Sequence, residues 1–382
     1  MIRFRNPLSR RAFVRALGLG GAAATMSPFA TARGSEALVS SQPASARTTA
    51  IRLDSNENPN GPGVKALDAM RAALTLANRY PYVEQDGLSA ALARLHRVRT
   101  SEVILGCGSA EVLRMAIQAF ASRTRHLVTA APTFEGPSRH AASFGVPVQA
   151  VRVDAALALN LTVMELSADR AGLVYLCNPN NPTGTILSGS AVSAFVERVG
   201  QASPQTAILI DEAYHDYVEE PGYQTSIPIA VARRNVIVSR TFSKLHGMAG
   251  LRCGYAVGHA ETIQALARFK LETSVNQLAI AAARAAIEDR GRIERERTIN
   301  RETRELARGL FASLGYPAAP SAANFFVVDL HRDSRAFRDA CRRAGVFIGR
   351  PFPPLNSFAR ISVGTMDEMQ RAGLVFKQIL GG

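Results

Sequence analysis

"SRTFSKLHGMAGLRCGYAVG", residues Ser239–Gly258, places a lysine between a run rich in hydroxyl groups and a run rich in glycine. The chain has 45 lysine and arginine residues, but only four are lysines: Lys65, Lys244, Lys270 and Lys377. Because arginine supplies almost all of the positive charge, a lysine at position 244 indicates a need for its amine. The segments before this stretch indicate which chemistry could use that amine.

Short apolar runs, each long enough for one β-strand, recur along the chain, and most are separated by segments with helical periodicity. The runs are 102–106, 126–130, 146–153, 172–177, 207–211, 235–239 and 252–258. This alternation predicts an α/β fold: a large domain with a seven-stranded, mostly parallel sheet covered by helices on both faces. Ligands bind such sheets at the carboxyl ends of the strands, so polar residues after each run are candidate site residues.

Composition and charge limit the other classes of function. With 382 residues, of which 47% are apolar, the chain can bury one large core or two packed domains. Its four cysteines form no CxxC pair, so we expect free, mostly buried thiols and no metal site. The formal net charge is +14, but in "GRIERERTINRETRELARGL" (291–310) arginines alternate with acids. That pattern predicts a long ion-paired helix near 290–314 and no nucleic-acid partner.

The N-terminus has the pattern of a targeting segment. "SRRAFVR" (9–15) precedes a weakly apolar, glycine-rich run at 16–32 that is too short to span a bilayer as a stable helix. It resembles a bacterial twin-arginine export signal, with Arg10 and Arg11 as the pair. We therefore expect recognition by the twin-arginine translocation machinery and a periplasmic or otherwise exported protein. A leader that does not function would leave the protein in the cytoplasm.

The predicted domain organisation follows from these segments. Residues 1–32 are expected to be the signal peptide and 33–50 a linker. An N-terminal arm at 51–75 is expected to contribute to a smaller α+β domain, which the chain completes at 290–382. The range 76–289 is expected to form the large domain with the sheet.

Polar residues follow several of the predicted strands. Ser109 follows the first run and opens a helix, which offers backbone N–H groups to an anion. The loop "NPNNPTG" (178–184) carries amides that can bind a ligand, and "DEAYHDY" (211–217) places Asp211 at a strand end. Each feature alone could be a capped helix or an ordinary loop.

Together these residues suit one cofactor. A partly desolvated lysine beside other cations becomes a nucleophile toward an aldehyde, and proteins most often hold pyridoxal phosphate this way. That cofactor is an electron sink only when its ring nitrogen stays protonated, which requires a carboxylate such as Asp211. Tyr214 and Asn181 can donate to its phenolic oxygen. Donors for its phosphate are the helix start at Ser109, with Thr241, Ser243 and Arg252.

Nine motifs in order carry a resemblance to a known family: "LDSNENPNGP", "RYP", "GCGSAEVL", "APTF", "NPNNPTG", "DEAYHDY", "RTFSKLHGMAGLRCGY", "SAANFF" and "ARISVGT". From about residue 51 to 376 the chain resembles a fold-type-I pyridoxal-phosphate-dependent aminotransferase, and within this class the histidinol-phosphate aminotransferase group. The resemblance implies that Lys244 forms a Schiff base with the cofactor and that Asp211 pairs with its ring nitrogen. It also implies that Phe134 stacks on the ring and that Ser109 and Ala110 bind the phosphate with Ser243 and Arg252.

The resemblance has further implications for the substrate and for assembly. Arg360 matches the residue that binds the substrate α-carboxylate, and Arg350 stands where the group places a second arginine near the distal end of the substrate. Asn60 stands on the substrate side where the group usually has an aromatic residue. Tyr80 is expected to reach the cofactor phosphate of a neighbouring subunit, which implies a homodimer.

The implied activity is transfer of an amino group to a 2-oxo acid such as 2-oxoglutarate. The donor would be a histidinol-phosphate-like amine or an aromatic or polar amino acid. Two alternatives stay open at this point. One is a decarboxylase of the threonine-phosphate type, which would use the same lysine. The other is a non-catalytic protein that binds pyridoxal phosphate on the same fold.

Overall fold

The computed structural model describes residues 50–381 of the chain. The expected signal peptide at 1–32, and all but the last residue of the expected linker at 33–50, lie outside these residues. The described residues belong to one compact unit, which begins at Thr48.

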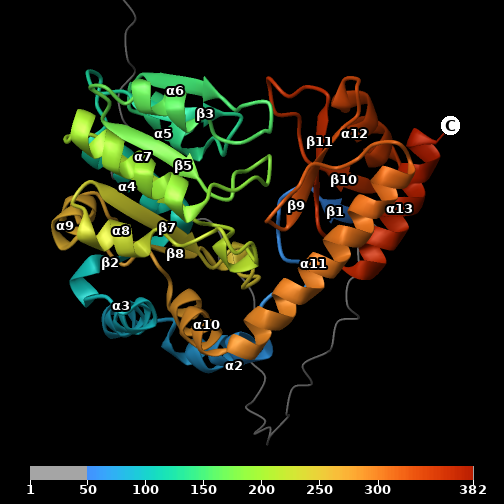
Figure 1. Ribbon diagram of the computed structural model, residues 1–382. Helices are drawn as coiled ribbons and strands as arrows, with labels where there is room; N and C mark the ends of the chain where they lie inside the picture. Colours follow the sequence, from blue (N-terminus) through green and yellow to red (C-terminus); the bar gives the residue numbers. More distant parts are fainter. Residues whose placement is uncertain (1–49, 382) are drawn as a thin grey trace, which may run out of the picture. The chain divides into compact units, whose positions relative to one another are not determined.

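A seven-stranded sheet forms the centre of the large domain, as predicted (Figure 1). Its strand order is β2-β8-β7-β6-β5-β3-β4; six strands run in the same direction and β8 runs opposite to them. Each predicted apolar run forms one of these strands, which confirms the predicted α/β class. The strands are β2 (Val103–Cys107), β3 (Leu127–Ala131), β4 (Val148–Arg152), β5 (Leu173–Cys177), β6 (Ala207–Asp211), β7 (Val236–Thr241) and β8 (Cys253–Gly258).

The central strands β5, β6, β7 and β8 are buried on both faces, whereas the edge strand β4 is mostly exposed. Successive side chains of a strand point to opposite faces, so each central strand contributes to two apolar clusters. In β6, Ile208 and Ile210 join one apolar cluster, while Ala207 and Leu209 join the other. The second cluster includes residues of α4 (Gly108–Phe120), α5 (Gly136–Ser143) and α9 (Ala260–Ala267). The first includes residues of α2 (Val64–Ala73), α3 (Tyr82–His96), α6 (Leu161–Leu166), α7 (Gly189–Ala202), α8 (Ile227–Ala232) and α10 (Gln277–Glu288).

The smaller domain contains two short sheets and three helices. Strand β1 (Ile51–Leu53) pairs in parallel with β10 (Val346–Ile348), and β9 (Phe325–Asp329) pairs antiparallel with β11 (Phe358–Ser362). A third apolar cluster lies between these strands and the helices α11 (Arg290–Ser313), α12 (Ser334–Arg343) and α13 (Met366–Leu380). Helix α11 occupies the range expected from its charge pattern and runs from the vicinity of α2 and α10 toward β9 (Figure 1).

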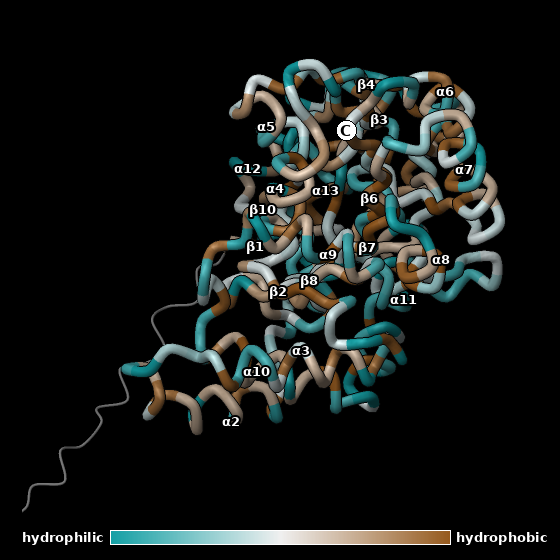
Figure 2. The backbone as a smooth tube through the Cα atoms, turned by 90° about the vertical axis from the view of Figure 1, so that its left-hand side faces the viewer, coloured by the Kyte–Doolittle hydropathy of each residue, from teal (hydrophilic) through white to brown (hydrophobic). Residues whose placement is uncertain are grey.

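The segment expected to be an N-terminal arm contacts both domains. Strand β1 is part of the smaller domain through its pairing with β10, whereas helix α2 packs against α10 of the large domain. Along the chain, hydrophobic segments recur in the central strands and hydrophilic segments recur in the outer helices and loops (Figure 2). None of the helices between residues 50 and 381 is long and apolar enough to cross a membrane.

Candidate active site

A cavity of about 540 Å³ lies where the loops after β5, β6 and β7 meet β11 and the loop after β10. All of the predicted site residues line it except Asn60 and Tyr80. Those at the cavity are Ser109, Ala110, Phe134, Asn181, Asp211, Tyr214, Thr241, Ser243, Lys244, Arg252, Arg350 and Arg360. The carboxyl edge of the parallel strands therefore holds the candidate site, as the sheet architecture predicts.

Lys244 projects into this cavity from the loop after β7. Its Nζ donates to the main-chain oxygens of Asn56 at 3.1 Å and Ser55 at 3.3 Å, and lies 5.7 Å from the centre of the Tyr214 ring. Burial lowers the pKa of this amine to about 8, and the nearby Arg360 guanidinium lowers it further than any other charge. A lower pKa leaves a larger fraction of the amine neutral, so Nζ can act as a nucleophile near neutral pH.

Asp211 is the last residue of β6 and is 2% exposed. Tyr175 of β5 donates to its Oδ2 at 2.9 Å. Burial raises the pKa of this carboxyl group to about 6, although the Tyr175 hydrogen bond and the nearby Ser239 act in the opposite direction. Among the described residues, neither Asp211 Oδ1 nor the Ser239 hydroxyl has a partner with hydrogen-bond geometry. A buried carboxylate oxygen without a partner is costly, and it is available to a ligand N–H.

Tyr214 and Asn181 lie next to each other above the strand ends. Asn181 Nδ2 donates to the Tyr214 hydroxyl at 3.3 Å, and Asn56 Nδ2 donates to the same oxygen at 3.1 Å. The Tyr214 ring packs edge-on against Phe325, with 5.0 Å between ring centres. Burial raises the pKa of the Tyr214 hydroxyl, so this group remains a neutral hydrogen-bond donor.

A second group of donors forms an anion cradle, which we define as Ser109, Ala110, Thr241, Ser243 and Arg252. Arg252 Nη1 lies 3.4 Å from Ser243 Oγ, and Thr241 Oγ1 lies 2.9 Å from the same atom. Helix α4 begins at Gly108, and Ser109 and Ala110 of its first turn line the cavity. The N–H groups of a first helical turn have no partner within the helix, so they are available to an anion here. Gly108 has φ +68°, and an added Cβ would collide with the Arg252 guanidinium. Glycine at this position therefore lets a fixed positive charge approach the helix start.

Arg360 of β11 reaches the cavity from the smaller domain and is 7% exposed. Its Nη1 donates to Asn181 Oδ1 at 2.7 Å, its Nη2 donates to the main-chain oxygen of Asp54, and its Nε has no partner among the described residues. The guanidinium lies 4.8 Å from the centre of the Phe352 ring. Burial lowers the pKa of Arg360 to about 10, but the group is still charged at neutral pH. It is a buried cation with bonding capacity left for an anion.

Arg350 lies at the rim of the cavity and is about half exposed. Its guanidinium stacks on Phe352 at 4.3 Å from the ring centre and pairs with Glu135 at 2.7 Å. Glu135 also faces Arg139 of α5, at 3.5 Å. Arg350 belongs to the smaller domain and Glu135 to the large domain, so this ion pair joins the two domains across the rim.

Asn60 and Tyr80 do not reach the cavity. The side chain of Asn60 donates to Glu296 of α11 at 2.9 Å, and Asn58 donates to the same carboxylate oxygen. These bonds hold the loop against α11. In this segment residues 54–57 line the cavity, so the expectation that Asn60 faces the substrate is wrong. Tyr80 is 74% exposed just before α3, so its expected contact with a neighbouring subunit stays a prediction.

The structure adds two residues to the site that the sequence did not single out. Asn56 has φ +53° and donates to Tyr214, while its own side chain accepts from Ser362 at 2.8 Å. Tyr175 holds Asp211 from the neighbouring strand. The sequence signal for Tyr175 is a tyrosine in an otherwise aliphatic buried strand, since a buried hydroxyl needs a polar partner. Asn56 lies within the motif "LDSNENPNGP", but nothing local in the sequence indicates that its amide donates to Tyr214.

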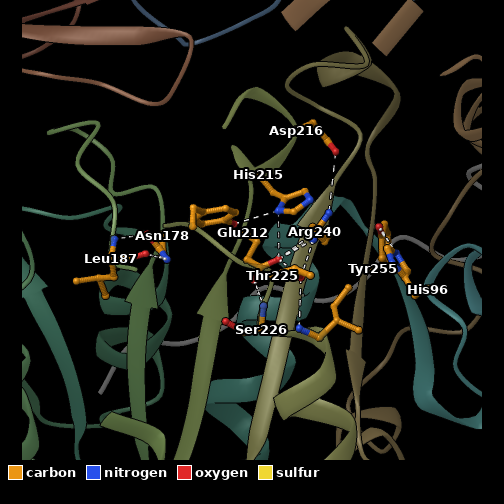
Figure 3. A network of polar contacts seen from close by, with 12 residues as sticks. His96, Asn178, Leu187, Glu212, His215, Asp216, Thr225, Ser226, Arg240 and Tyr255 are labelled. Atoms are coloured by element: carbon orange, nitrogen blue, oxygen red, sulfur yellow. Dashed lines mark hydrogen bonds and ion pairs between the residues drawn. The ribbon is translucent and has the colours of Figure 1, made fainter. Parts of the chain in front are cut away.

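A polar network includes the buried Glu212 and Arg240 together with Thr225 (Figure 3). Arg240 donates to Glu212 at 2.8 Å, and Glu212 also accepts from Thr225 at 2.9 Å. His215 adjoins this pair, and burial lowers its pKa to about 4. Because Glu212 follows Asp211 and Arg240 precedes Thr241, the network fixes two adjacent strand ends from which site residues project.

The geometry fits pyridoxal phosphate. The cavity offers an amine with a lowered pKa, a buried carboxylate oxygen that lacks a partner, donors for a phenolic oxygen, and an anion cradle at a helix start. Phe134 supplies an aromatic face at the same cavity. No cluster of metal-ligating side chains occurs among residues 50–381. The fold and the site together define a fold-type-I pyridoxal-phosphate-dependent enzyme.

Comparison with known proteins identifies the family within this class. Residues 48–374 match the family model "Aminotransferase class I and II". A histidinol-phosphate aminotransferase of Moorella thermoacetica is 36% identical over 338 residues, which cover 86% of this chain and 85% of that protein. A second histidinol-phosphate aminotransferase, of Symbiobacterium thermophilum, is 35% identical over a match that covers 87% of this chain and 91% of that protein. The solved structure of histidinol-phosphate aminotransferase from Sinorhizobium meliloti in complex with pyridoxal-5'-phosphate has a TM-score of 0.81 at 28% identity. That match covers 86% of this chain and 91% of the other.

The chain belongs to the class I and II aminotransferases. It is therefore a pyridoxal-phosphate-dependent enzyme that moves an amino group between an amino donor and a 2-oxo acid.

Proposed function

We propose that the donor substrate carries an anionic or strongly polar group at its distal end, as a histidinol-phosphate-like amine does. The observation that carries this proposal is the pair of arginines on one aromatic ring: Arg360 inside the cavity and Arg350 at its rim, both stacked on Phe352. Two guanidinium groups at different depths suit a molecule with two separated polar ends. The relatives named above are consistent with such a donor.

The residues then have separate tasks in the reaction. When bound, pyridoxal phosphate supplies an electron sink for the negative charge that develops at the substrate α-carbon. Lys244 Nζ holds or moves a proton at that carbon, because its lowered pKa lets it exchange protons near neutral pH. Asp211 Oδ1, which is buried and has no partner among the described residues, would accept a hydrogen bond from the ring nitrogen and favour its protonated form. Arg360 orients the carboxylate of the amino acid or 2-oxo acid, which limits rotation of the reacting bond.

We also propose that the enzyme acts as a homodimer. Large apolar side chains are exposed close together along α2, α3 and the segment between them, including Val64 at 72%, Tyr80 at 74% and Val83 at 79%. A second copy of the chain would cover such side chains and would let Tyr80 contact the other subunit. Sedimentation equilibrium of the wild type and of Tyr80→Ala, with cofactor retention measured in both, tests this arrangement.

Export through the twin-arginine pathway is proposed from the sequence alone, since Arg10 and Arg11 lie outside the described residues. That pathway suits an enzyme whose cofactor is bound in a folded protein before translocation. Cell fractionation of a strain expressing the full chain should recover the protein in the periplasm. Arg10→Lys with Arg11→Lys should leave it in the cytoplasm with an uncut leader, and continued export of this variant would refute the pathway.

Amino transfer is favoured over the decarboxylase and over a non-catalytic role. The two relatives named above, at 36% and 35% identity, are aminotransferases, whereas the L-threonine-O-3-phosphate decarboxylase of Porphyromonas gingivalis is 21% identical and shares the fold alone. The test is a panel of amines and amino acids with 2-oxoglutarate, including histidinol phosphate, with glutamate and CO2 measured in parallel. Glutamate formation that is fastest with an anionic donor is expected. A preference for uncharged donors would overturn the proposed substrate class.

A further inference from the structure

Cys107 and Cys253 are cross-strand neighbours beside the anion cradle. Cys107 is the last residue of β2 and Cys253 is the first residue of β8, and the antiparallel register pairs them directly. Both are thiols in this structure; Cys253 is fully buried and Cys107 is partly exposed. The sequence did not indicate this proximity, because the two residues are far apart along the chain and belong to no cysteine motif.

The hydrogen bonds identify the kind of cross-strand pair. The main-chain oxygen of Cys253 accepts from Phe242 on the β7 side, and the N–H of Cys107 donates to the Glu111 carboxylate. The N–H and C=O of a strand residue point to the same side, so the main chain of Cys253 faces β7 and makes no hydrogen bond to β2. Cys107 and Cys253 are therefore a non-hydrogen-bonded pair. In such pairs the Cα atoms lie about 4.5 Å apart, which is within the range of about 4.4–6.8 Å found in disulfides.

Both cysteines are joined directly to residues that shape the cradle. Cys107 precedes Gly108, the first residue of α4, and Cys253 follows Arg252. The two segments already pack closely, since a Cβ added at Gly254 would collide with the backbone of Gly108 and Ser109. A covalent bond here would therefore connect the helix start that faces the cavity to the strand that presents the Arg252 guanidinium.

We propose that Cys107 and Cys253 form a reversible disulfide that holds the two halves of the anion cradle together and slows loss of the cofactor. The oxidant is a disulfide of the glutathione class. The partly exposed Cys107 thiolate attacks one sulfur of oxidised glutathione and releases one glutathione thiolate. Cys253 then loses its proton and attacks the Cys107 sulfur, which releases the second glutathione thiolate. Two protein thiols become one disulfide, and one oxidised glutathione becomes two reduced molecules.

The second step should be slow in the folded protein. Burial raises the pKa of the Cys253 thiol to about 12, so little thiolate is present at neutral pH. The export proposed above would place the pair in an oxidising compartment, where slow formation is sufficient and the bond persists. The disulfide goes beyond the proposed amino transfer and does not depend on which donor the enzyme uses.

The test uses the cofactor-loaded wild type, incubated with oxidised glutathione and then analysed by mass spectrometry of the intact chain and of its peptides. The expected result is a loss of two thiols among the four, and a linked peptide pair containing Cys107 and Cys253 that dithiothreitol separates. Cys341→Ser, in α12 of the smaller domain, should still form the bond, whereas Cys107→Ser should not. A wild type that keeps all thiols, or that links other cysteines, overturns the proposal.

The consequence for the cofactor is measured separately. Oxidised wild type should release pyridoxal phosphate several-fold more slowly than reduced wild type when diluted into a scavenger of the free cofactor. Its melting temperature should also rise, on the order of 5–10 °C for a bond that closes so long a loop. Neither quantity should respond to oxidant in Cys107→Ser. Equal release rates in the oxidised and reduced wild type would refute a role of the disulfide in holding the cradle together. The release measurement does not require turnover of any donor.

Discussion

Arg360 and Asn181 are hydrogen-bonded at 2.7 Å, although one belongs to the smaller domain and the other to a loop of the large domain. This bond connects the residue expected to hold the substrate carboxylate to the residue that donates to Tyr214. Substrate binding at Arg360 would therefore act on the hydrogen-bonding group at the cofactor's expected phenolic oxygen. The pair gives a direct physical connection between the two halves of the site.

Covalent attachment of the cofactor should occur at Lys244. Reduction of the loaded enzyme with borohydride should fix pyridoxal phosphate on the peptide that contains Lys244. Of the four lysines, Lys244 is the one that lines the cavity, and the pKa of its amine is lowered to about 8. Lys244→Ala should lose the visible absorption of the bound cofactor. Lys270→Arg is the matched control, since Lys270 is partly buried but bonds to Gln85 away from the cavity. Label on the Lys270 peptide would contradict the assignment.

The pH dependence of cofactor loading should follow the amine of Lys244. Because its pKa is lowered from 10.5 to about 8, the neutral nucleophile is scarce below this pH and predominates above it. Loading of cofactor-free enzyme should accelerate roughly tenfold per pH unit up to the midpoint and then level off. Stopped-flow absorbance over pH 6–10 measures this rate of cofactor loading.

Arg360→Gln should move that midpoint upward, because after burial the Arg360 guanidinium lowers the Lys244 pKa most. Arg338→Gln is the control: Arg338 lines the same cavity but is not among the charges that shift the Lys244 pKa most. If both variants kept the midpoint of the wild type, or both moved it, the electrostatic contribution assigned to Arg360 would be incorrect.

Asp211→Asn should fold and bind pyridoxal phosphate but lose roughly three or more orders of magnitude in kcat. The reason is that a neutral amide cannot hold the ring nitrogen protonated, while the Tyr175 hydroxyl can still donate to its oxygen. Single-turnover kinetics with a good donor, together with circular dichroism and cofactor absorbance, separate lost chemistry from lost structure. Turnover close to that of the wild type would mean that Asp211 only completes the strand end.

The sheet could be predicted from the sequence because its strands are continuous apolar runs, a pattern that buried parallel strands require. The run at 207–211 coincides with β6, whereas the run at 146–153 is longer than β4, which ends where its pairing with β3 ends. The residues at the cavity were also predictable, since strand order places the carboxyl ends at one edge.

Long-range contacts could not be predicted in the same way. Asn60 bonds to Glu296, 236 residues away, and this partner diverts it from the cavity. The pairing of Glu135 with Arg350 depends on how the two domains meet, and no local pattern specifies it. The same holds for Asn56, whose left-handed backbone conformation directs its amide toward Tyr214.

The selectivity for charge should reside in Arg350. Arg350→Ala should reduce kcat/KM for a donor with an anionic distal group by about 30-fold, equivalent to roughly 2 kcal/mol, because a charge-assisted hydrogen bond is lost at a partly exposed site. Small neutral donors should change by less than about twofold, since they do not reach the rim. The measurement is kcat/KM for donors that share the amine and differ only in distal charge. Equal losses for charged and neutral donors would show that Arg350 supports the fold.

Glu135→Gln should have the opposite effect on the same donors. Glu135 pairs with Arg350 at 2.7 Å, so an anionic group must compete with this carboxylate for the guanidinium. Removing its charge should lower KM for anionic donors by roughly threefold, the modest effect expected when an exposed ion pair is lost, and should leave neutral donors unchanged. Arg139 faces the same carboxylate at 3.5 Å, and Arg139→Gln should not reproduce the effect because it leaves the Glu135–Arg350 pair intact. A raised KM for anionic donors in Glu135→Gln would mean that Glu135 positions Arg350 for the substrate instead of competing with it.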